Sequence, residues 1–207
     1  MNEWILHNEL IIRGGAFIAV LIPMAFWEIA APRRPLTDSK SLRWSSNLGI
    51  VLLNVLVLRL VLPVGAVGLA WLSSERGWGL LNNLAVPYVL SVVLSVVVLD
   101  FVIYVQHVLF HAIPALWMLH MTHHADVDFD VTTGTRFHPI EIFLSMLIKF
   151  AVVAALGPPV LGVLIFEIVL NATAMFNHSN VRVPLGVDRI LRLLVVTPDM
   201  HRVHHSV

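Results

Sequence analysis

The stretch DFVIYVQHVLFHAIPALWMLHMTHH, residues 100–124, joins an apolar segment to two groups of closely spaced histidines. The groups have the patterns H-x-x-x-H and H-x-x-H-H, and their members are His107, His111, His120, His123 and His124. Side chains three or four positions apart lie on one face of an α-helix. Each group therefore points its imidazoles in one direction if the chain is helical. Pro114, between the groups, ends one helix and can open the next at its first position.

The second pattern returns near the end of the chain, at His201, His204 and His205. The preceding Thr197–Asp199 is typical of a helix start, with a hydroxyl cap, a proline and an acid in the first turn. These three histidine boxes supply eight imidazoles. A structural zinc ion takes four ligands and an octahedral metal six, so eight convergent imidazoles imply two metal ions. Imidazole binds zinc, copper, iron and nickel, so the ligand type does not identify the metal.

The composition is that of an integral membrane protein. Of the 207 residues, 58% are apolar and 13% are charged, against roughly 45–50% and about 25% in ordinary soluble domains. The apolar residues fall in runs near the length needed to cross a bilayer. A formal net charge of zero argues against nucleic acid as a partner. The absence of cysteine excludes disulfides and thiolate metal sites.

The charge distribution predicts the topology. Apolar segments are expected at residues 14–30, 48–72 and 86–110. The loop after the first segment is basic and contains Arg33, Arg34, Lys40 and Arg43. By the positive-inside rule this loop is cytoplasmic, so the N-terminus starts outside and the third segment returns to the cytoplasm. The first two boxes are therefore expected at the cytoplasmic face.

The apolar stretch 140–176 is interrupted by Gly157–Pro159, which indicates a tight hairpin that crosses the membrane and returns. Two crossings between the second and third boxes allow them to share one metal centre. The sequence thus predicts an all-α, four-helix-type membrane bundle, with about three spans plus the hairpin and a cytoplasmic histidine-lined cap. We expect one membrane domain over residues 1–207, with N-terminal helices in 1–85 and the histidine-box part in 86–207.

Several polar residues outside the boxes are further candidates for the site. Asp100 and Tyr104 lie seven and three positions before His107 and share its helical face. Two interpretations of Asp100 stay open: it accepts a hydrogen bond from a ligating imidazole, or it forms an ion pair with Arg59. His138 is a ligand, a hydrogen-bond partner of a ligand, or a loop anchor.

Other polar residues lie within or just after the apolar runs. Ionisable side chains are costly there, so for Arg59, Lys149 and Glu167 we expect structural pairing or charged ends that reach the membrane surface. Asn177 and His178 follow the hairpin and emerge on the cytoplasmic side, which makes both candidates for the metal site.

The boxes and the segments between them resemble the fatty acid hydroxylase/sterol desaturase superfamily. Beside the box patterns, the segments similar to its bacterial sterol-desaturase-like members are Arg136–Glu141, His178–Asn180 and Thr197–His205. The resemblance covers residues 100–207. Residues before about position 85 are similar only to generic membrane helices.

The resemblance implies a membrane-bound, non-haem di-iron oxygenase that hydroxylates or desaturates a C–H bond of a fatty acyl, sterol or related lipid. It also implies O₂ as oxidant, a ferredoxin or cytochrome b5-like electron donor, and a bacterial inner-membrane location with a cytoplasmic metal site. Zinc can replace iron during overexpression. The implied iron ligands are His107, His111, His120, His123, His124, His201, His204 and His205, with His178 as a further one.

Two departures from the superfamily pattern matter. Some relatives carry a second histidine four residues before the one matching His178, where this chain has Ala174, so His138 or water would take that place. Members usually continue for several tens of residues past the last box, whereas this sequence ends at Val207, so an inactive truncated relative is one alternative. The others are a carotenoid hydroxylase and a non-catalytic membrane metal-binding or transport protein.

Overall fold

The computed structural model describes residues 1–206, and these form helices and loops with one isolated β-bridge between Pro32 and Val181. The long helices are α1 (Asn2–Ala30), α2 (Lys40–Val61), α5 (Tyr88–Ala112), α7 (Pro139–Leu156) and α8 (Val160–Asn177). The short helices are α3 (Ala66–Arg76), α4 (Leu80–Asn83), α6 (Pro114–His124), α9 (Leu185–Leu191), α10 (Pro198–His204) and the 3₁₀ turn η1 (Thr133–Thr135). The predicted all-α class is confirmed.

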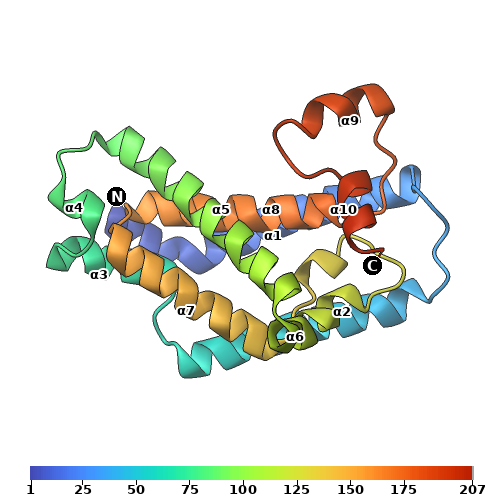
Figure 1. Cartoon of the computed structure of the whole chain (residues 1–207), viewed down its shortest axis with the longest axis horizontal. Coiled ribbons are helices and arrows are strands. Elements are labelled where there is room, and N and C mark those ends of the chain that lie inside the picture. The colour runs from blue at the N-terminus through green and yellow to red at the C-terminus, as the bar shows by residue number, and fades with distance from the viewer. Residues whose placement is uncertain (207) are drawn as a thin grey trace.

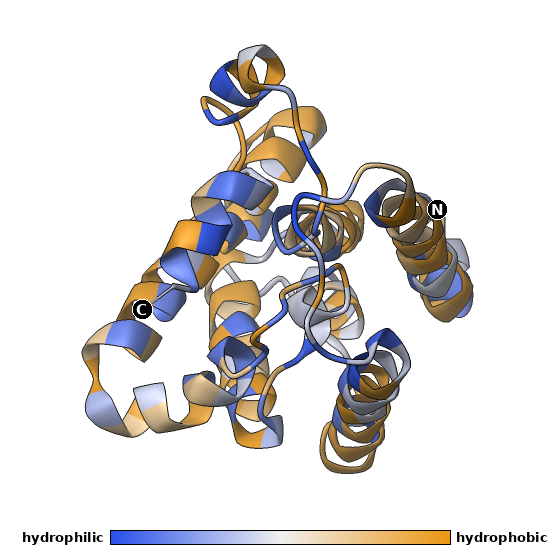
Figure 2. Cartoon of the chain, turned by 90° about the vertical axis from the view of Figure 1, so that its right-hand side faces the viewer, coloured by the Kyte–Doolittle hydropathy of each residue, from blue (hydrophilic) through white to orange (hydrophobic). Residues whose placement is uncertain are grey.

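Five segments are long and apolar enough to cross a membrane. They are Asn2–Ala30, Lys40–Asn83, Tyr88–Ala112, Pro139–Leu156 and Val160–Asn177. The long helices lie side by side with their axes roughly along one direction, as Figure 1 shows. In the view of Figure 2 they are mostly hydrophobic, whereas hydrophilic residues gather in the loops and short helices. This is the arrangement of a multi-pass membrane protein, because a helix satisfies its own backbone hydrogen bonds in lipid.

The two ends of the bundle collect different parts of the chain. α3, α4 and the α7–α8 turn meet at one end, while α6, α9, α10 and the loop after α6 meet at the other (Figure 1). The α7–α8 hairpin is confirmed: Gly157 has φ of 64° and a Cβ there would lie 2.4 Å from the Trp78 carbonyl oxygen. Glycine is therefore required at this turn both for its backbone conformation and for its contact.

Close helix contacts fix the centre of the bundle. α8 packs on α1 and α5, and a Cβ at Gly162 of α8 would lie 2.9 Å from the Ser95 Cβ of α5. Leu99, Val163 and Phe166 are buried in the apolar core at this interface. Since His107 and His111 lie near the end of α5 and His178 directly follows α8, this contact sets the spacing of these histidines.

The expected second segment, 48–72, lies within the candidate span Lys40–Asn83, but the structure divides it between two helices. α2 stops at Val61, and α3 begins only at Ala66. Pro63 explains the break, because it lacks a backbone N–H and disfavours helical conformation in the residue before it. The first helix is also longer than expected and begins at Asn2 instead of position 14.

The structural pairing expected for Lys149 and Glu167 is confirmed. Glu167 is only 2% exposed, and its carboxylate lies 3.0 Å from Lys149 Nζ and 2.9 Å from an Arg13 guanidinium nitrogen. Arg59 is exposed on α2 and forms no ion pair within residues 1–206. Its position in an apolar helix suits a side chain whose charged end reaches the membrane surface.

Candidate metal centre

Nine of the eleven histidines meet at one end of the bundle, where α5, α6, α8 and α10 come together. Their ring nitrogens form two four-membered groups, each with all its atoms within 4.8 Å of one another. The first set is His107, His111, His120 and His204. The second set is His123, His178, His201 and His205. The remaining member, His124, groups with His204 and His205, one histidine from each set.

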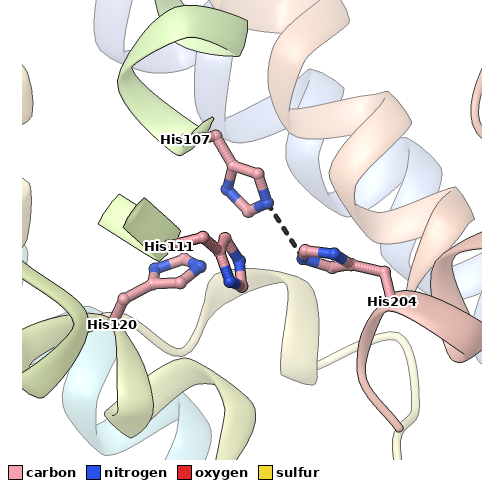
Figure 3. Close-up of side chains that lie close together, drawn as sticks. All are labelled: His107, His111, His120 and His204. Carbon is pink, nitrogen blue, oxygen red and sulfur yellow. Dashed lines mark hydrogen bonds between the residues drawn. The ribbon is translucent and has the colours of Figure 1, made fainter. Parts of the chain in front are cut away.

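Helix geometry explains how the boxes divide between the sets. His107 and His111 are one turn apart on α5 and both enter the first set, as Figure 3 shows. In α6 the second box contributes to both sets: His120 enters the first and His123 the second, while His124 belongs to neither. The third box divides in the same way. Ile113 is both the C-cap of α5 and the N-cap of α6, so the two helices are separated by a single residue. This sharp turn before Pro114 lets the first two boxes face each other.

Three imidazoles have their Nδ1 atoms held by oxygen acceptors. His120 Nδ1 donates to the Glu141 carboxylate at 2.7 Å, and His123 Nδ1 to the Arg136 carbonyl at 3.1 Å. His178 Nδ1 donates to the carbonyl oxygen of Ala174, in α8, at 2.7 Å. A carbonyl cannot donate, so the proton of His123 and of His178 lies on Nδ1 and the Nε2 lone pair is free. This is the arrangement that fixes metal-ligating histidines.

The free nitrogens face each other at distances that suit a cation. His178 Nε2 lies 2.9 Å from both His123 Nε2 and His201 Nε2. His123 and His178 each carry their proton on Nδ1, so the Nε2 atoms cannot hydrogen-bond to each other. Two ligands at right angles on one metal, each about 2.0–2.1 Å away, would be separated by about 2.9 Å. The donor set therefore fits a metal ion in the second set.

Several ring nitrogens of the cluster are buried and have no hydrogen-bond partner among residues 1–206. These atoms are His111 Nε2, His120 Nε2 and both ring nitrogens of His124 and of His205. Leaving a buried polar atom unpaired costs about 1–3 kcal/mol. So many unpaired nitrogens in one cluster fit a group of side chains that could hold cations.

Burial lowers the pKa of several cluster histidines that lie outside the spanning helices. Burial is the largest cause that lowers the pKa of His124 and His201 to about 3 and that of His205 to about 2, and neighbouring histidines add to it. The pKa values of His123 and His178 lie well below the ordinary value for the same reasons. Neutral imidazoles are the form that binds metal, so the cluster is ready to bind at neutral pH.

Aromatic rings pack against several histidines of the cluster. Phe137 stacks on His123 with ring centres 4.4 Å apart, and Trp117 lies 5.1 Å from His111. Phe129 is 5.0 Å from His205 and 3% exposed. These apolar walls lower the polarity around any bound metal.

The N-terminal helices hold the loop that links the second box to η1. The Arg43 guanidinium in α2 contacts Asp126 and Asp130, at 2.8 Å and 2.7 Å. The Glu28 carboxylate in α1 accepts hydrogen bonds from the backbone N–H groups of Val131 at 2.7 Å and Asn180 at 2.8 Å. Glu28 thus ties the loop after α6 to the loop after His178. The loop over residues 126–136 is rich in polar residues, but its aspartates and threonines are mostly buried.

The further candidates from the sequence lie in different places. His138 caps α7, its Nδ1 accepting from Ile140 N–H at 3.1 Å, and it belongs to neither histidine set. Asp100 and Tyr104 are exposed, and within residues 1–206 neither interpretation of Asp100 is seen. Asn177 ends α8, and its buried side-chain oxygen has no hydrogen-bond partner in the part of the chain that the structure describes.

Glu141 is the residue that sequence reasoning missed. It is 4% exposed and accepts a hydrogen bond from His120, the contact considered for Asp100. An acid in the first turn after His138–Pro139 reads as an ordinary helix-start residue, which hides this role. Ala174 occupies the position where some relatives have a second histidine. Its backbone carbonyl oxygen accepts a hydrogen bond from His178.

Comparisons with known proteins match the histidine-bearing part of the chain. The sequence model of the family described as "Fatty acid hydroxylase" matches residues 92–207. The chain is 32% identical over 120 residues to ornithine lipid hydroxylase OlsE of Rhizobium tropici, covering 58% of this chain and 35% of that protein. It is 31% identical over 108 residues to alkylglycerol monooxygenase of Homo sapiens and of Xenopus tropicalis, covering 52% of this chain and 23% of each relative. The chain thus spans 23–35% of the length of these relatives. No solved structure matches.

Proposed function

The chain belongs to the fatty acid hydroxylase family, and on this premise we propose that it is a membrane-bound, non-haem di-iron oxygenase that hydroxylates or desaturates a lipid C–H bond. The observation that carries the proposal is the pair of four-histidine sets, with His124 between them. Eight or nine imidazole ligands exceed what one metal ion can take. Two iron ions are therefore the proposed cofactor, with zinc as a substitute in purified protein.

When bound, the metal pair would supply the activation of O₂ and the oxidation of the C–H bond. The protein's own residues hold and orient the ligands. Glu141 fixes the ring of His120, and the Arg136 carbonyl fixes that of His123. Phe129 and the other aromatic rings keep water from the cluster. Two electrons must arrive from an external donor such as a ferredoxin or cytochrome b5-like protein.

The relatives ornithine lipid hydroxylase and alkylglycerol monooxygenase are named for an ornithine lipid and an alkylglycerol, which supports a polar lipid as substrate. Such a molecule would place its head group at the histidine end and its chain among the apolar helices. Lipid profiling separates this proposal from a carotenoid hydroxylase. A metal transporter is less well supported, because transport needs ligands along a path at membrane depth, whereas both sets lie at one end of the bundle.

The central test is metal content together with O₂ uptake. Purified, metal-replete protein should contain two metal ions per chain, consume O₂ when reduced in the presence of lipid, and change the lipids of expressing cells. A His120→Ala/His123→Ala variant removes one histidine from each set. It should bind fewer than two metal ions, consume no O₂ and leave the lipids of expressing cells unchanged. A ratio of one metal ion or fewer in well-folded protein would contradict the two-metal proposal.

We further propose that the metal site faces the cytoplasm, as in a bacterial inner-membrane protein. The chain lacks cysteine, so single cysteines can be labelled from either side of the membrane. Cysteines at Lys40 and Val127, both at the histidine end, should react only from the cytoplasmic side. A cysteine at Asn82 should react only from the opposite side. Val127 is chosen because it is 73% exposed, whereas its neighbour Asp128 is buried. Labelling of Lys40 and Val127 from opposite sides would contradict a shared face.

A further inference from the structure

Exposed apolar side chains form a patch on α9 and on the turn that follows it. Leu185 is 72% exposed, Ile190 66%, Leu193 80% and Leu194 83%. Val187 and Val196 are also exposed. We call these six residues the α9 patch. So many large apolar side chains in one short segment are unfavourable in water and mark a contact with another apolar phase or partner.

Basic side chains flank the α9 patch. Arg182, Arg189 and Arg192 are all exposed. Arg192 forms an ion pair with the buried Asp188, whereas Arg182 and Arg189 have no side-chain ion pair within residues 1–206. Leucines beside exposed arginines are typical of segments that lie in a membrane surface, with the apolar groups among the acyl chains and the guanidinium groups at the phosphates.

The place of α9 in the fold suits such a contact. Both Figure 1 and Figure 2 show α9 standing off the side of the bundle, and in Figure 1 it is level with the end of α8. The side of the bundle is the surface that the spanning helices turn toward lipid. In sequence, α9 connects His178 to His201, which are both members of the second histidine set.

We propose that the α9 patch is a membrane-surface anchor that inserts its leucines into the bilayer and binds anionic lipid phosphates through Arg182 and Arg189. Attraction of basic residues to anionic lipid and burial of apolar side chains act together in this kind of contact. The anchor would hold the bilayer surface beside the metal cluster. The inference rests on exposure and charge alone and does not depend on the catalytic proposal.

The absence of natural cysteine allows a direct test. Leu194→Cys, labelled with the environment-sensitive fluorophore NBD, is placed in phosphatidylcholine vesicles with or without phosphatidylglycerol. We expect lipids with a nitroxide on the acyl chain to quench the label and aqueous iodide not to do so. Ser39→Cys, exposed at the same end but outside the patch, is the matched water-facing control. Leu52→Cys, 60% exposed on α2, is the lipid-facing control.

The outcomes separate the anchor from its alternatives. A Leu194 label that behaves like the Ser39 label would overturn the proposal. A label shielded from iodide but not quenched by nitroxide lipid would also overturn it and would assign the patch to a protein contact, such as a second copy of the chain. Phosphatidylglycerol should increase the nitroxide quenching, and Arg182→Gln/Arg189→Gln should abolish that increase. No response to phosphatidylglycerol in the parent would overturn the assignment to anionic lipid.

Discussion

Arg43 in α2 and Asp126 in the loop after α6 form a two-pronged ion pair, in which both nitrogen–oxygen distances are 2.8 Å. Both residues are buried, although 83 positions separate them in the chain. Arg43 lies outside the part of the chain that matches the family, which begins at residue 92. The position of the second box therefore depends on a helix that the family resemblance does not describe.

Replacing Arg43 with alanine should unfold or loosen the loop after α6. The change leaves the carboxylates of Asp126 and Asp130 buried without their cation, a loss of about 3–5 kcal/mol in stability. Thermal unfolding and metal content in detergent would measure the effect. Arg59→Gln, at an exposed position of the same helix, should change neither. Equal behaviour of the two variants would show that the buried pair is unimportant.

Glu141→Gln should reduce function without unfolding the chain. Glutamine keeps an oxygen that accepts from His120 Nδ1 but removes the charge that orients and polarises this imidazole. Changes of this kind typically cost about 10–100-fold in metal affinity or activity. Metal titration and turnover of the variant would be compared with those of Asp100→Asn, whose exposed carboxylate contacts no histidine within residues 1–206. A larger loss in Asp100→Asn would restore the role first considered for Asp100.

Gly134→Ala should disturb the second histidine set. A Cβ at this glycine would lie 2.5 Å from the Ala174 carbonyl oxygen and 3.0 Å from His178 Nδ1. η1 must then move away from α8, and the hydrogen bond that orients His178 is lost or bent. We expect a metal content nearer one than two ions per chain. Gly49→Ala, where nothing lies within 4 Å, is the matched control and should keep its metal.

Acid should destabilise the metal-free protein. In the folded state His124 and His201 have a pKa of about 3, whereas an unfolded histidine has a pKa of about 6.5. The unfolded chain therefore binds more protons below pH of about 6.5, so stability is fully present above that pH and falls as the pH drops toward about 3. Unfolding of metal-free protein in detergent, followed from neutral to acidic pH, measures this. Bound metal should be released over the upper part of the same range.

The histidine spacing predicted the most about this chain, because box members one turn apart must share a helix face. Gly157–Pro159 predicted the hairpin for an equally local reason. Contacts between distant segments could not be read in this way: nothing near Arg43 or near Asp126 identifies the other as its partner. Glu141 was missed for the same reason, since its contact with His120 depends on how α7 packs beside α6. The helix break at Pro63 could have been predicted from the proline itself, but the long apolar run around it favoured one membrane span.

The order of the ligands along the chain has a consequence for biogenesis. His107 is the first histidine of the two sets and His205 the last, and all five candidate spans precede the third box. The ribosome therefore delivers all five of these candidate spans to the insertion machinery before either set of four can close. Metal loading must then follow membrane insertion, so the cell has to supply the ions to a chain already in place. A failure of insertion would leave nine imidazoles from different helices with no common site.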